Sequence, residues 1–400
     1  FIIMATSFAL FVFLGKRSIS ISLVLAAIIG SLLSGKGIPI RHLVEGTFGY
    51  IDTILIITIA MIFMRVIQKS GLLATIANII IMKFKDRPIF LLLLIMLLVM
   101  FPGMITGSST AAVLTTGAMV APVLIYGMIA PPVNVPAMII GGGIDMPYIG
   151  FTFPLLLASL PLAFVSAILL GYKYINKLNI ADQQKQLPKS YLDEYGVKIF
   201  TPVFILIILM LGQNAFPQVF PNFGLGLIFL ISSLSGLFTG KKFNFFHTSK
   251  EAVNDALPVL GILMGVGIFI QIMTLTGARG AIVILCLSVP SYLLYLGAGI
   301  SLPLFGAISS YGSASVLGVP FILAFLGNNE IITGSALSLI SGLGDLMPPT
   351  ALAGMFAAKV VNEKNYFKVL KNCIWPGIMT IGYGIFLIIN ANLIDRKSVV

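Results

Sequence analysis

Apolar runs long enough to cross a lipid bilayer recur along the whole chain, and this feature restricts the possible folds more than any other. A helix needs roughly 20 apolar residues to cross about 30 Å of hydrocarbon. Backbone polar groups inside a bilayer must be satisfied within the protein, so these runs predict helices. The runs lie at 1–14, 19–34, 51–68, 88–102, 152–172, 198–213, 218–238, 256–275, 281–299 and 373–394.

The scarcity of charged residues leads to the same interpretation. Hydrophobic residues make up 58% of the 400 residues and charged residues only 9%, whereas soluble domains carry roughly 25% charged residues. Most of the surface must therefore face lipid or other helices. We predict an all-α, multi-span membrane protein with the lipid bilayer as its main partner.

The net charge of +11 does not indicate nucleic-acid binding. Basic residues cluster in the connectors between apolar runs, for example at 83–87, 173–198 and 241–250. Anionic headgroups and the positive-inside bias produce this pattern. We expect no nucleic-acid partner.

Metal and cofactor motifs are not indicated either. Cys286 and Cys373 lie in apolar runs, and His42 and His247 lie in short polar connectors. None of the four has partners at metal-ligand spacing. We expect no cofactor beyond a coupling Na⁺ or H⁺, and no enzymatic activity or catalytic residue.

The most polar connector, 173–197, divides the chain into a first repeat, 1–172, and a second repeat, 198–400. Each half contains one stretch, 102–154 or 302–349, that is apolar but rich in Gly, Ser, Thr and Pro. These residues weaken helices and free backbone groups. Such backbone is tolerated at membrane depth only where protein buries it or a cavity hydrates it.

The two stretches have the same order of features at an offset of about 200 residues, the kind of symmetry that secondary transporters with inverted repeats have. We therefore predict a re-entrant hairpin and a broken helix in each half. The hairpins are expected at about 102–131 and 302–327, and the broken helices at about 135–154 and 331–349. The matched pairs are Gly107-Ser108 with Gly312-Ser313, Pro122 with Pro320, Asp145 with Asp345, and Gly71 with Gly277.

Interrupted helices of this kind offer binding groups without a buried charge. Free N–H groups at a helix start suit a carboxylate, and free carbonyls with hydroxyls suit Na⁺. Small residues also permit tight helix packing, but their recurrence beside matched acids favours a site. The candidate substrate- and ion-binding residues are Thr106, Gly107, Ser108, Ser109, Thr110, Gly143, Asp145, Ser309, Ser310, Gly312, Ser313, Gly344, Asp345 and Pro348. The candidate Na⁺ ligands among them are Ser108, Ser109, Asp145, Ser310, Ser313 and Asp345.

The charged residues in these regions have alternative interpretations. An aspartate at membrane depth usually faces a cavity, pairs with a cation or stays protonated, but Asp145 or Asp345 alone also suits a helix cap. Arg279, after Gly277, suits a substrate carboxylate, although we expect it to extend to the membrane interface instead.

In their order and spacing these segments resemble the large membrane subunit of TRAP (tripartite ATP-independent periplasmic) transporters, in the ion-transporter superfamily. The resemblance covers nearly the whole chain. In place of the acids usual in the family's hairpins this chain has Ala112 and Ser310, and Asp145 and Asp345 have no evident family counterpart, which indicates a divergent branch. The resemblance to these subunits rests on four segments: Asp52-Thr53 through Gly71, Gly107-Ser108-Ser109 through Pro122, Gly306 through Pro320, and Gly344 through Pro349.

The resemblance implies an elevator transporter in the bacterial inner membrane. The spans around 19–68 and 198–275 would form a fixed scaffold, and a transport domain with both hairpins and both broken helices would move. The implied activity is Na⁺-coupled uptake of a small organic anion such as a carboxylate. The implied partners are a small four-helix membrane subunit and a periplasmic binding protein.

Two alternatives stay open. Within the superfamily, the chain is also compatible with a stand-alone dicarboxylate or citrate symporter that acts as a homodimer. In another class, Gly342-Leu343-Gly344-Asp345 has the G-x-G-D pattern of intramembrane aspartyl proteases, with Asp145 as the second acid of a proton-sharing pair. That signature lacks the Tyr-Asp that precedes it and the Pro-Ala-Leu that follows it in those enzymes.

Overall fold

A computed structural model describes residues 2–107, 126–146, 148, 150–175, 188–215, 218, 221, 223–307, 309–325, 327–347 and 365–398. These residues form helices and no β-strand, so the predicted all-α class is confirmed. Within them, six helices are long and apolar enough to span a bilayer. They are Ile51–Lys69, Pro88–Thr106, Thr152–Tyr172, Leu192–Gln213, Phe245–Leu275 and Phe367–Ile389.

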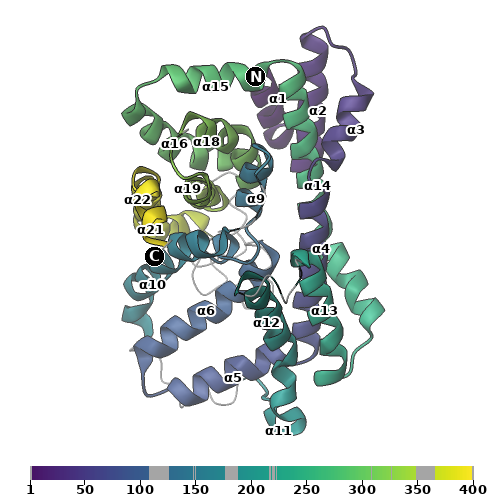
Figure 1. The fold of residues 1–400 in the computed structure, drawn as a ribbon, viewed down its shortest axis with the longest axis vertical. Coiled ribbons are helices and arrows are strands. Elements are labelled where there is room, and N and C mark those ends of the chain that lie inside the picture. The colour runs from purple at the N-terminus through teal and green to yellow at the C-terminus, as the bar shows by residue number, and fades with distance from the viewer. Residues whose placement is uncertain are drawn as a thin grey trace.

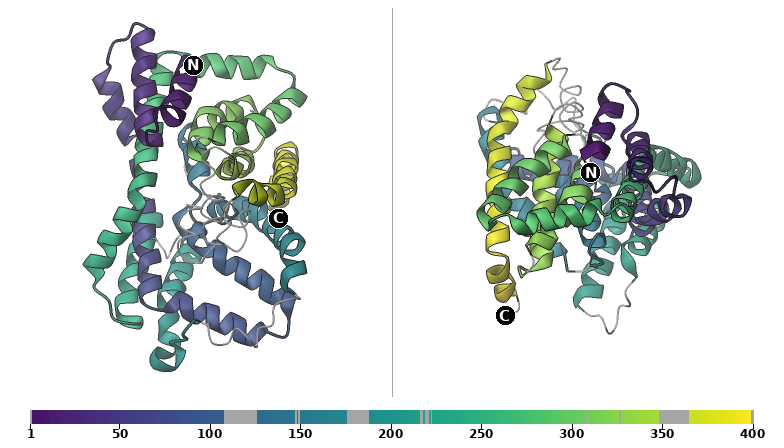
Figure 2. Two further views of the ribbon diagram at one scale, coloured as in Figure 1. Left: turned by 180° about the vertical axis from the view of Figure 1, so that it is seen from behind. Right: turned by 90° about the horizontal axis from the view of Figure 1, so that it is seen from above.

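The helices stand in two groups (Figure 1). We call the first group the column, because its helices form a tall stack, and Figure 2 shows the same stack from behind and from above. Its long helix α14 packs along α2, α3 and α4, and α13 packs against α4 and α12. The helices of the column are α1 (Ile2–Phe13), α2 (Ile19–Leu33), α3 (Ile40–Phe48), α4 (Ile51–Lys69), α11 (Leu192–Tyr195), α12 (Thr201–Ala215), α13 (Gly224–Thr239) and α14 (Phe245–Leu275), with the 3₁₀ turn η2 (Gly196–Phe200) before α12.

The second group, which we call the block, contains the described parts of both predicted hairpins and both predicted broken helices. Within it α19 packs against α9, α10, α16 and α21. Its helices are α6 (Pro88–Thr106), α9 (Val135–Gly142), α10 (Thr152–Ile175), α16 (Ser291–Gly306), α17 (Ser310–Ser313), the π-helix η3 (Ala314–Gly318), α18 (Val319–Ala324), α19 (Glu330–Gly342), the 3₁₀ turn η4 (Leu343–Leu346), α21 (Tyr366–Ile389) and α22 (Ala391–Ser398).

Two arms join the column to the block at opposite ends of the molecule (Figure 1). The arm α5 (Leu72–Phe84) follows α4, and the arm α15 (Ala278–Ser288) follows α14. Each arm begins after a left-handed glycine, Gly71 with φ 85° and Gly277 with φ 73°. Glycine adopts this conformation without the steric penalty that other residues meet. The inverted repeat stays a prediction, and these matched turns support it.

Pro290 divides the span predicted at 281–299, so that prediction is wrong. The arm α15 ends at Ser288, and α16 begins at Ser291 as the first limb of the second hairpin. Proline lacks an N–H donor and crowds the preceding turn, so a helix usually ends before it. The short helices α3 and α5 are not among the predicted spans, because neither contains a long apolar run.

The helix α14 begins at Phe245, well before the apolar run predicted at 256–275. Asn244 caps it, since its Oδ1 accepts a hydrogen bond from the His247 backbone N–H at 3.0 Å. A helix of 31 residues is about 46 Å long at 1.5 Å per residue, which exceeds the hydrocarbon thickness of about 30 Å. The charged first turns of α14 therefore extend beyond the hydrocarbon.

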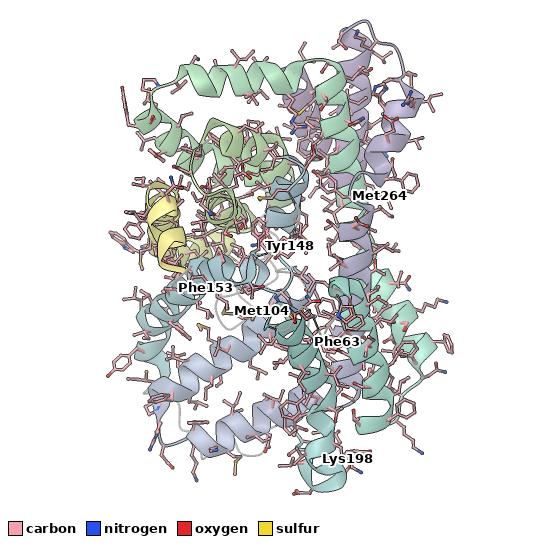
Figure 3. All side chains as sticks on the ribbon, in the orientation of Figure 1. Phe63, Met104, Tyr148, Phe153, Lys198 and Met264 are labelled. Atoms are coloured by element: carbon pink, nitrogen blue, oxygen red, sulfur yellow. The ribbon has the colours of Figure 1, made fainter. Side chains whose placement is uncertain are left out.

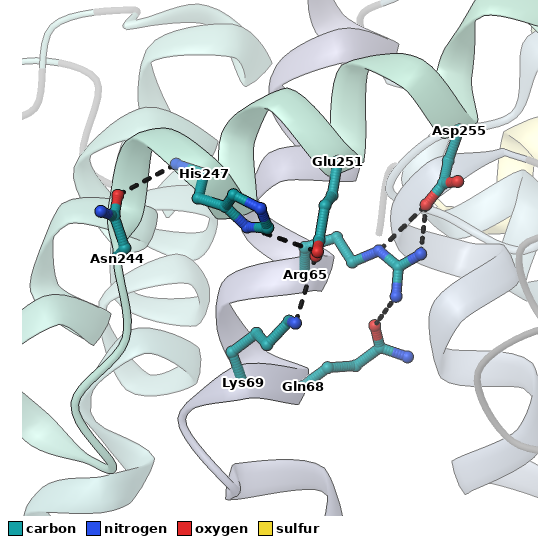
Figure 4. A network of polar contacts seen from close by, with 7 residues as sticks. All are labelled: Arg65, Gln68, Lys69, Asn244, His247, Glu251 and Asp255. Atoms are coloured by element: carbon teal, nitrogen blue, oxygen red, sulfur yellow. Dashed lines mark hydrogen bonds and ion pairs between the residues drawn. The ribbon is translucent and has the colours of Figure 1, made fainter.

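Those first turns carry an ion-pair ladder to α4 (Figure 4). Arg65 pairs with Asp255, and its Nε donates to Asp255 Oδ2 at 3.0 Å. Lys69 Nζ lies 3.2 Å from a carboxylate oxygen of Glu251. Since the later residue of α4 pairs with the earlier residue of α14, the two helices are antiparallel here. The ladder fixes the register of the two helices that lead into the arms.

We expect this ladder to stabilise the column measurably. In a double-mutant cycle of Arg65→Met and Asp255→Leu, the coupling free energy should be about 0.5–1 kcal/mol, at the upper end for partly exposed ion pairs. Unfolding in mixed micelles measures it. The control pair, Arg41 and Glu45 within α3, is more exposed and should give a smaller coupling free energy, because solvent screens the two charges. Additive effects at Arg65 and Asp255 would contradict the expectation.

Candidate functional site

The second predicted hairpin is formed by α16 and the helical segment 310–324, which meet at a turn. Ala307 and Ser309 lie in this turn, and the second limb of the hairpin already begins at Ser310. The reason is Ser309, whose Oγ accepts a hydrogen bond from the Gly312 backbone N–H at 3.1 Å. A serine cap of this kind starts a helix, so Ser310, Gly312 and Ser313 are already helical.

The second predicted broken helix lies directly against this hairpin. The helix α19 tightens into η4 at Leu343, and the chain becomes extended at Met347. A Cβ on Gly306 would lie 2.8 Å from Gly344 Cα, and a Cβ on Gly344 would overlap the Gly306 backbone. The end of α16 and η4 therefore meet backbone to backbone. Asp345 follows in η4 and is only 7% exposed.

Most serine hydroxyls of this region hold the hairpin together. Ser313 Oγ donates to the Leu302 carbonyl at 2.6 Å, and Ser341 Oγ donates to the Ser310 carbonyl at 2.8 Å. The hydroxyl of Ser313, a predicted Na⁺ ligand, is thus used within the fold. Within the part of the chain that the structure describes, the Ser310 hydroxyl makes no hydrogen bond. Among the predicted hydroxyls that the structure describes, that of Ser310 is therefore the one not used by the fold.

The first predicted hairpin is described at its two ends. Thr106 is the last residue of α6, and its hydroxyl donates to the Pro102 carbonyl at 2.7 Å. Gly107 follows with φ 61°, and a Cβ there would lie 2.7 Å from a methyl group of Val135. Both its conformation and its surroundings therefore require glycine. Four of the predicted site residues, Ser108, Ser109, Thr110 and Pro348, lie outside the described residues.

The interrupted elements of the two halves meet inside the block. The Tyr311 hydroxyl donates to the Gly107 carbonyl at 3.0 Å, which joins the second hairpin to the end of α6. Asn134 Nδ2 donates to Ser338 Oγ at 3.0 Å, which joins the start of α9 to α19. These contacts are buried. Gly107 thus lies at an interrupted helix end, as predicted, whereas Tyr311 and Asn134 are not among the predicted site residues.

A sequence signal for Asn134 does exist in the repeat. Asn134 Oδ1 accepts from the Ala137 backbone N–H at 2.8 Å, and so caps α9. Asn329 Oδ1 accepts from the Ile332 backbone N–H at 2.9 Å, and so caps α19. Asparagine is among the preferred caps at a helix start. Its recurrence before both broken helices is a match that aligning the halves would reveal.

Figure 3 shows the side chains that surround these elements, with Tyr148 and Met104 near the middle of the molecule and Lys198 near one end. The Tyr148 hydroxyl accepts a hydrogen bond from the Asn134 backbone N–H at 3.1 Å, and its ring stacks on Phe151 at 5.0 Å between centroids. An aromatic layer thus covers the start of α9.

Asp145 and Asp345, which match in sequence, lie in different environments. Asp145 follows α9 with φ 57° and is exposed, whereas Asp345 is buried. Aspartate is among the few residues that adopt positive φ readily. Beside Asp145, the Gly143 carbonyl accepts a hydrogen bond from the guanidinium of Arg279. Arg279 thus contacts the first half of the molecule, and its extension to the membrane interface stays a prediction.

No family model matches the chain, and no curated protein is similar to it in sequence. Among solved structures, its fold is similar to that of the YdaH transporter of Alcanivorax borkumensis, which is described as having an unusual topology. The TM-score is 0.58 and the identity 13%, with 94% of this chain and 98% of that chain covered. With its apolar spans, the chain is an integral membrane protein, and its fold is similar to that of this transporter. The resemblance to TRAP large subunits stays a prediction.

The contact between Gly306 and Gly344 should not tolerate a larger residue. We expect Gly344→Ala to lower the free energy of unfolding by about 1–3 kcal/mol, the usual cost of overpacking, because only backbone lies opposite the new methyl group. Thermal unfolding in detergent measures it. The control is Gly377→Ala in α21, where a Cβ would meet nothing within 4 Å. This substitution should raise the free energy of unfolding by up to about 1 kcal/mol, because alanine favours a helix more than glycine does. Equal stability of the two variants would contradict the contact.

Proposed function

We propose that the chain is a secondary active transporter that couples uptake of a small organic anion, such as a carboxylate, to a cation, Na⁺ in preference to H⁺. The observation that carries the proposal is the meeting of interrupted helix ends from both halves, where Tyr311 contacts the Gly107 carbonyl. In secondary transporters, substrate and ion sites lie where discontinuous helices of two repeats meet. The transporter fold supports the same class.

The proposed site pairs an anion with a cation. The start of the helical segment 310–324 presents backbone N–H groups and the Ser310 hydroxyl, and a helix start favours negative charge. The buried Asp345 and the neighbouring backbone carbonyls favour a cation. Charges bound close together in a low-dielectric site attract strongly, so each ligand raises the affinity for the other. This mutual dependence is what couples their movement.

The two-group architecture supports an elevator mechanism, in which the block carries the site past the column. Contacts between the groups include apolar and small side chains, which slide more readily than ion pairs. The Phe8 ring of the column lies 6.5 Å, between centroids, from Phe269 of the column and equally far from Phe305 of the block. Tyr50 of the column faces Gly142 of the block. The glycine turns before both arms supply hinge positions.

The protein partners that we propose differ between two branches of the superfamily. The resemblance to TRAP transporters favours a periplasmic binding protein, a small membrane subunit and a bacterial inner membrane. Uptake that requires an added binding protein would support that branch. Uptake by the purified chain alone, as a homodimer, would support a stand-alone dicarboxylate or citrate symporter.

Uptake of organic acids into proteoliposomes tests the proposal. An inward Na⁺ gradient should drive uptake of at least one carboxylate, and the same gradient of K⁺ should not. Ser310→Ala should weaken apparent substrate or ion affinity by roughly 10- to 150-fold, since a hydrogen bond to a charged group contributes about 1.5–3 kcal/mol. Its stability should stay unchanged, because this hydroxyl makes no hydrogen bond within the described residues.

The matched control is Ser309→Ala one residue earlier. It removes the cap on Gly312 and should lower the free energy of unfolding by about 1 kcal/mol. Uptake that is indifferent to both Na⁺ and pH would refute the coupling. An unchanged affinity in Ser310→Ala would remove Ser310 from the site.

A further inference from the structure

Arg279 is placed to act on the opposite half of the molecule. It is the second residue of the arm α15, in the second half, and its guanidinium donates to the carbonyl of Gly143, in the first half. The side chain is partly buried, and no carboxylate of the described residues pairs with it. Its positive charge is therefore directed at a helix end instead of an acid.

That helix end is the one at which a cation is favoured. The α-helix α9 ends at Gly142, and its C-terminal end carries a partial negative charge of about half an electron. The Ile139 carbonyl accepts from the Gly143 N–H at 3.0 Å, and the Gly141 carbonyl accepts from the Met146 N–H at 2.9 Å. No backbone N–H of the described residues donates to the Gly143 carbonyl, which accepts its hydrogen bond from Arg279.

Side chains from both halves of the molecule lie beside this contact. A Cβ on Gly142 would lie 3.5 Å from the Tyr50 ring, and a Cβ on Gly143 would overlap Val319 of the second hairpin. Tyr50 also packs against Gly267 of α14, where a Cβ would be 3.4 Å away. Arg279, Tyr50 and Val319 thus lie against the end of the first broken helix, where Gly142 and Asp145 stay exposed.

The matched position in the first arm does not carry a positive charge. Counting from the matched turns at Gly71 and Gly277, the repeat counterpart of Arg279 is Leu73, which is apolar and buried. The first arm therefore cannot supply a cation to the end of the second broken helix. At that end lies Asp345, a buried acid.

We infer that Arg279 is a tethered cation that replaces the coupling ion of the first repeat, so that transport uses one mobile cation, bound at the second broken helix beside Asp345. This inference rests on the proposed function and makes it more specific. In this inference, the Arg279 guanidinium occupies the predicted ion site at Gly143 and Asp145 in place of a mobile ion. Of the two cation-attracting ends that the repeat provides, only one then contributes to the driving force.

The test compares Arg279→Gln, which removes the charge, with Arg279→Lys, which keeps it. The full-length purified chain is titrated with NaCl against choline chloride, and thermal stability and proteoliposome uptake are recorded. The Hill coefficient for Na⁺ should be about 1 in the wild type and in Arg279→Lys, and should rise toward about 2 in Arg279→Gln, whose vacated helix end now binds a second ion. Arg41→Gln on the exposed face of α3 is the matched control and should behave as the wild type.

The outcomes of this test either support or overturn the role of Arg279 as a tethered cation. A wild-type Hill coefficient of about 2, or an unchanged coefficient in a folded Arg279→Gln, would overturn the tethered cation. If Arg279→Gln does not fold in low salt, its recovery in high NaCl but not in choline chloride supports the inference, and recovery in neither overturns it. A wild type that ignores Na⁺ in uptake and stability contradicts the proposed Na⁺ coupling itself, and the inference falls with it.

Discussion

A helix that stops inside a bilayer leaves backbone groups without partners, and the architecture of the block follows from how these groups are satisfied. The hydrocarbon supplies no hydrogen-bond partner for them, and each unmet group costs several kcal/mol. The block meets the demand with short-range devices: asparagine and serine caps at helix starts, and the Tyr311 hydroxyl on the Gly107 carbonyl. Gly306 and Gly344 let two interrupted elements approach backbone to backbone. Satisfying the breaks therefore forces the interrupted helices of the two halves together.

The column, unlike the block, consists mainly of uninterrupted helices. Its main helices satisfy their own backbone groups, so their sequences can be almost uniformly apolar, and their charges gather where α14 leaves the hydrocarbon. There Arg65 and Lys69 pair with Asp255 and Glu251 across the antiparallel crossing of α4 and α14. A group of complete spans is rigid along its length, whereas a group of interrupted helices concentrates polar backbone in its interior. This division matches what a fixed support and a moving binding domain require.

The parts that the sequence predicts well depend on local chemistry. The spans α2 and α4 lie within a residue of their apolar runs, because burial in lipid and helix formation give the same pattern. The parts that it predicts poorly depend on context. Pro290 ends a helix inside an apolar run, and α14 continues through charged turns because Asn244 caps it and α4 pairs with it. Tyr311 and Arg279 contact residues more than a hundred positions away, and no local pattern reports such a contact.

A fold with two repeats contains the same cation-attracting helix end twice, and a single substitution can decide what each of these ends binds. A helix end that attracts a cation can bind an ion from solution or an arginine from the protein. Either positive charge, while it is bound there, stabilises a nearby anion. The difference is thermodynamic. An ion that is bound on one side of the membrane and released on the other contributes the free energy of its gradient, whereas an arginine stays with the protein and contributes none. Arg279 in one arm and Leu73 in the other would therefore set the number of ions that drive each cycle without altering the fold that carries them.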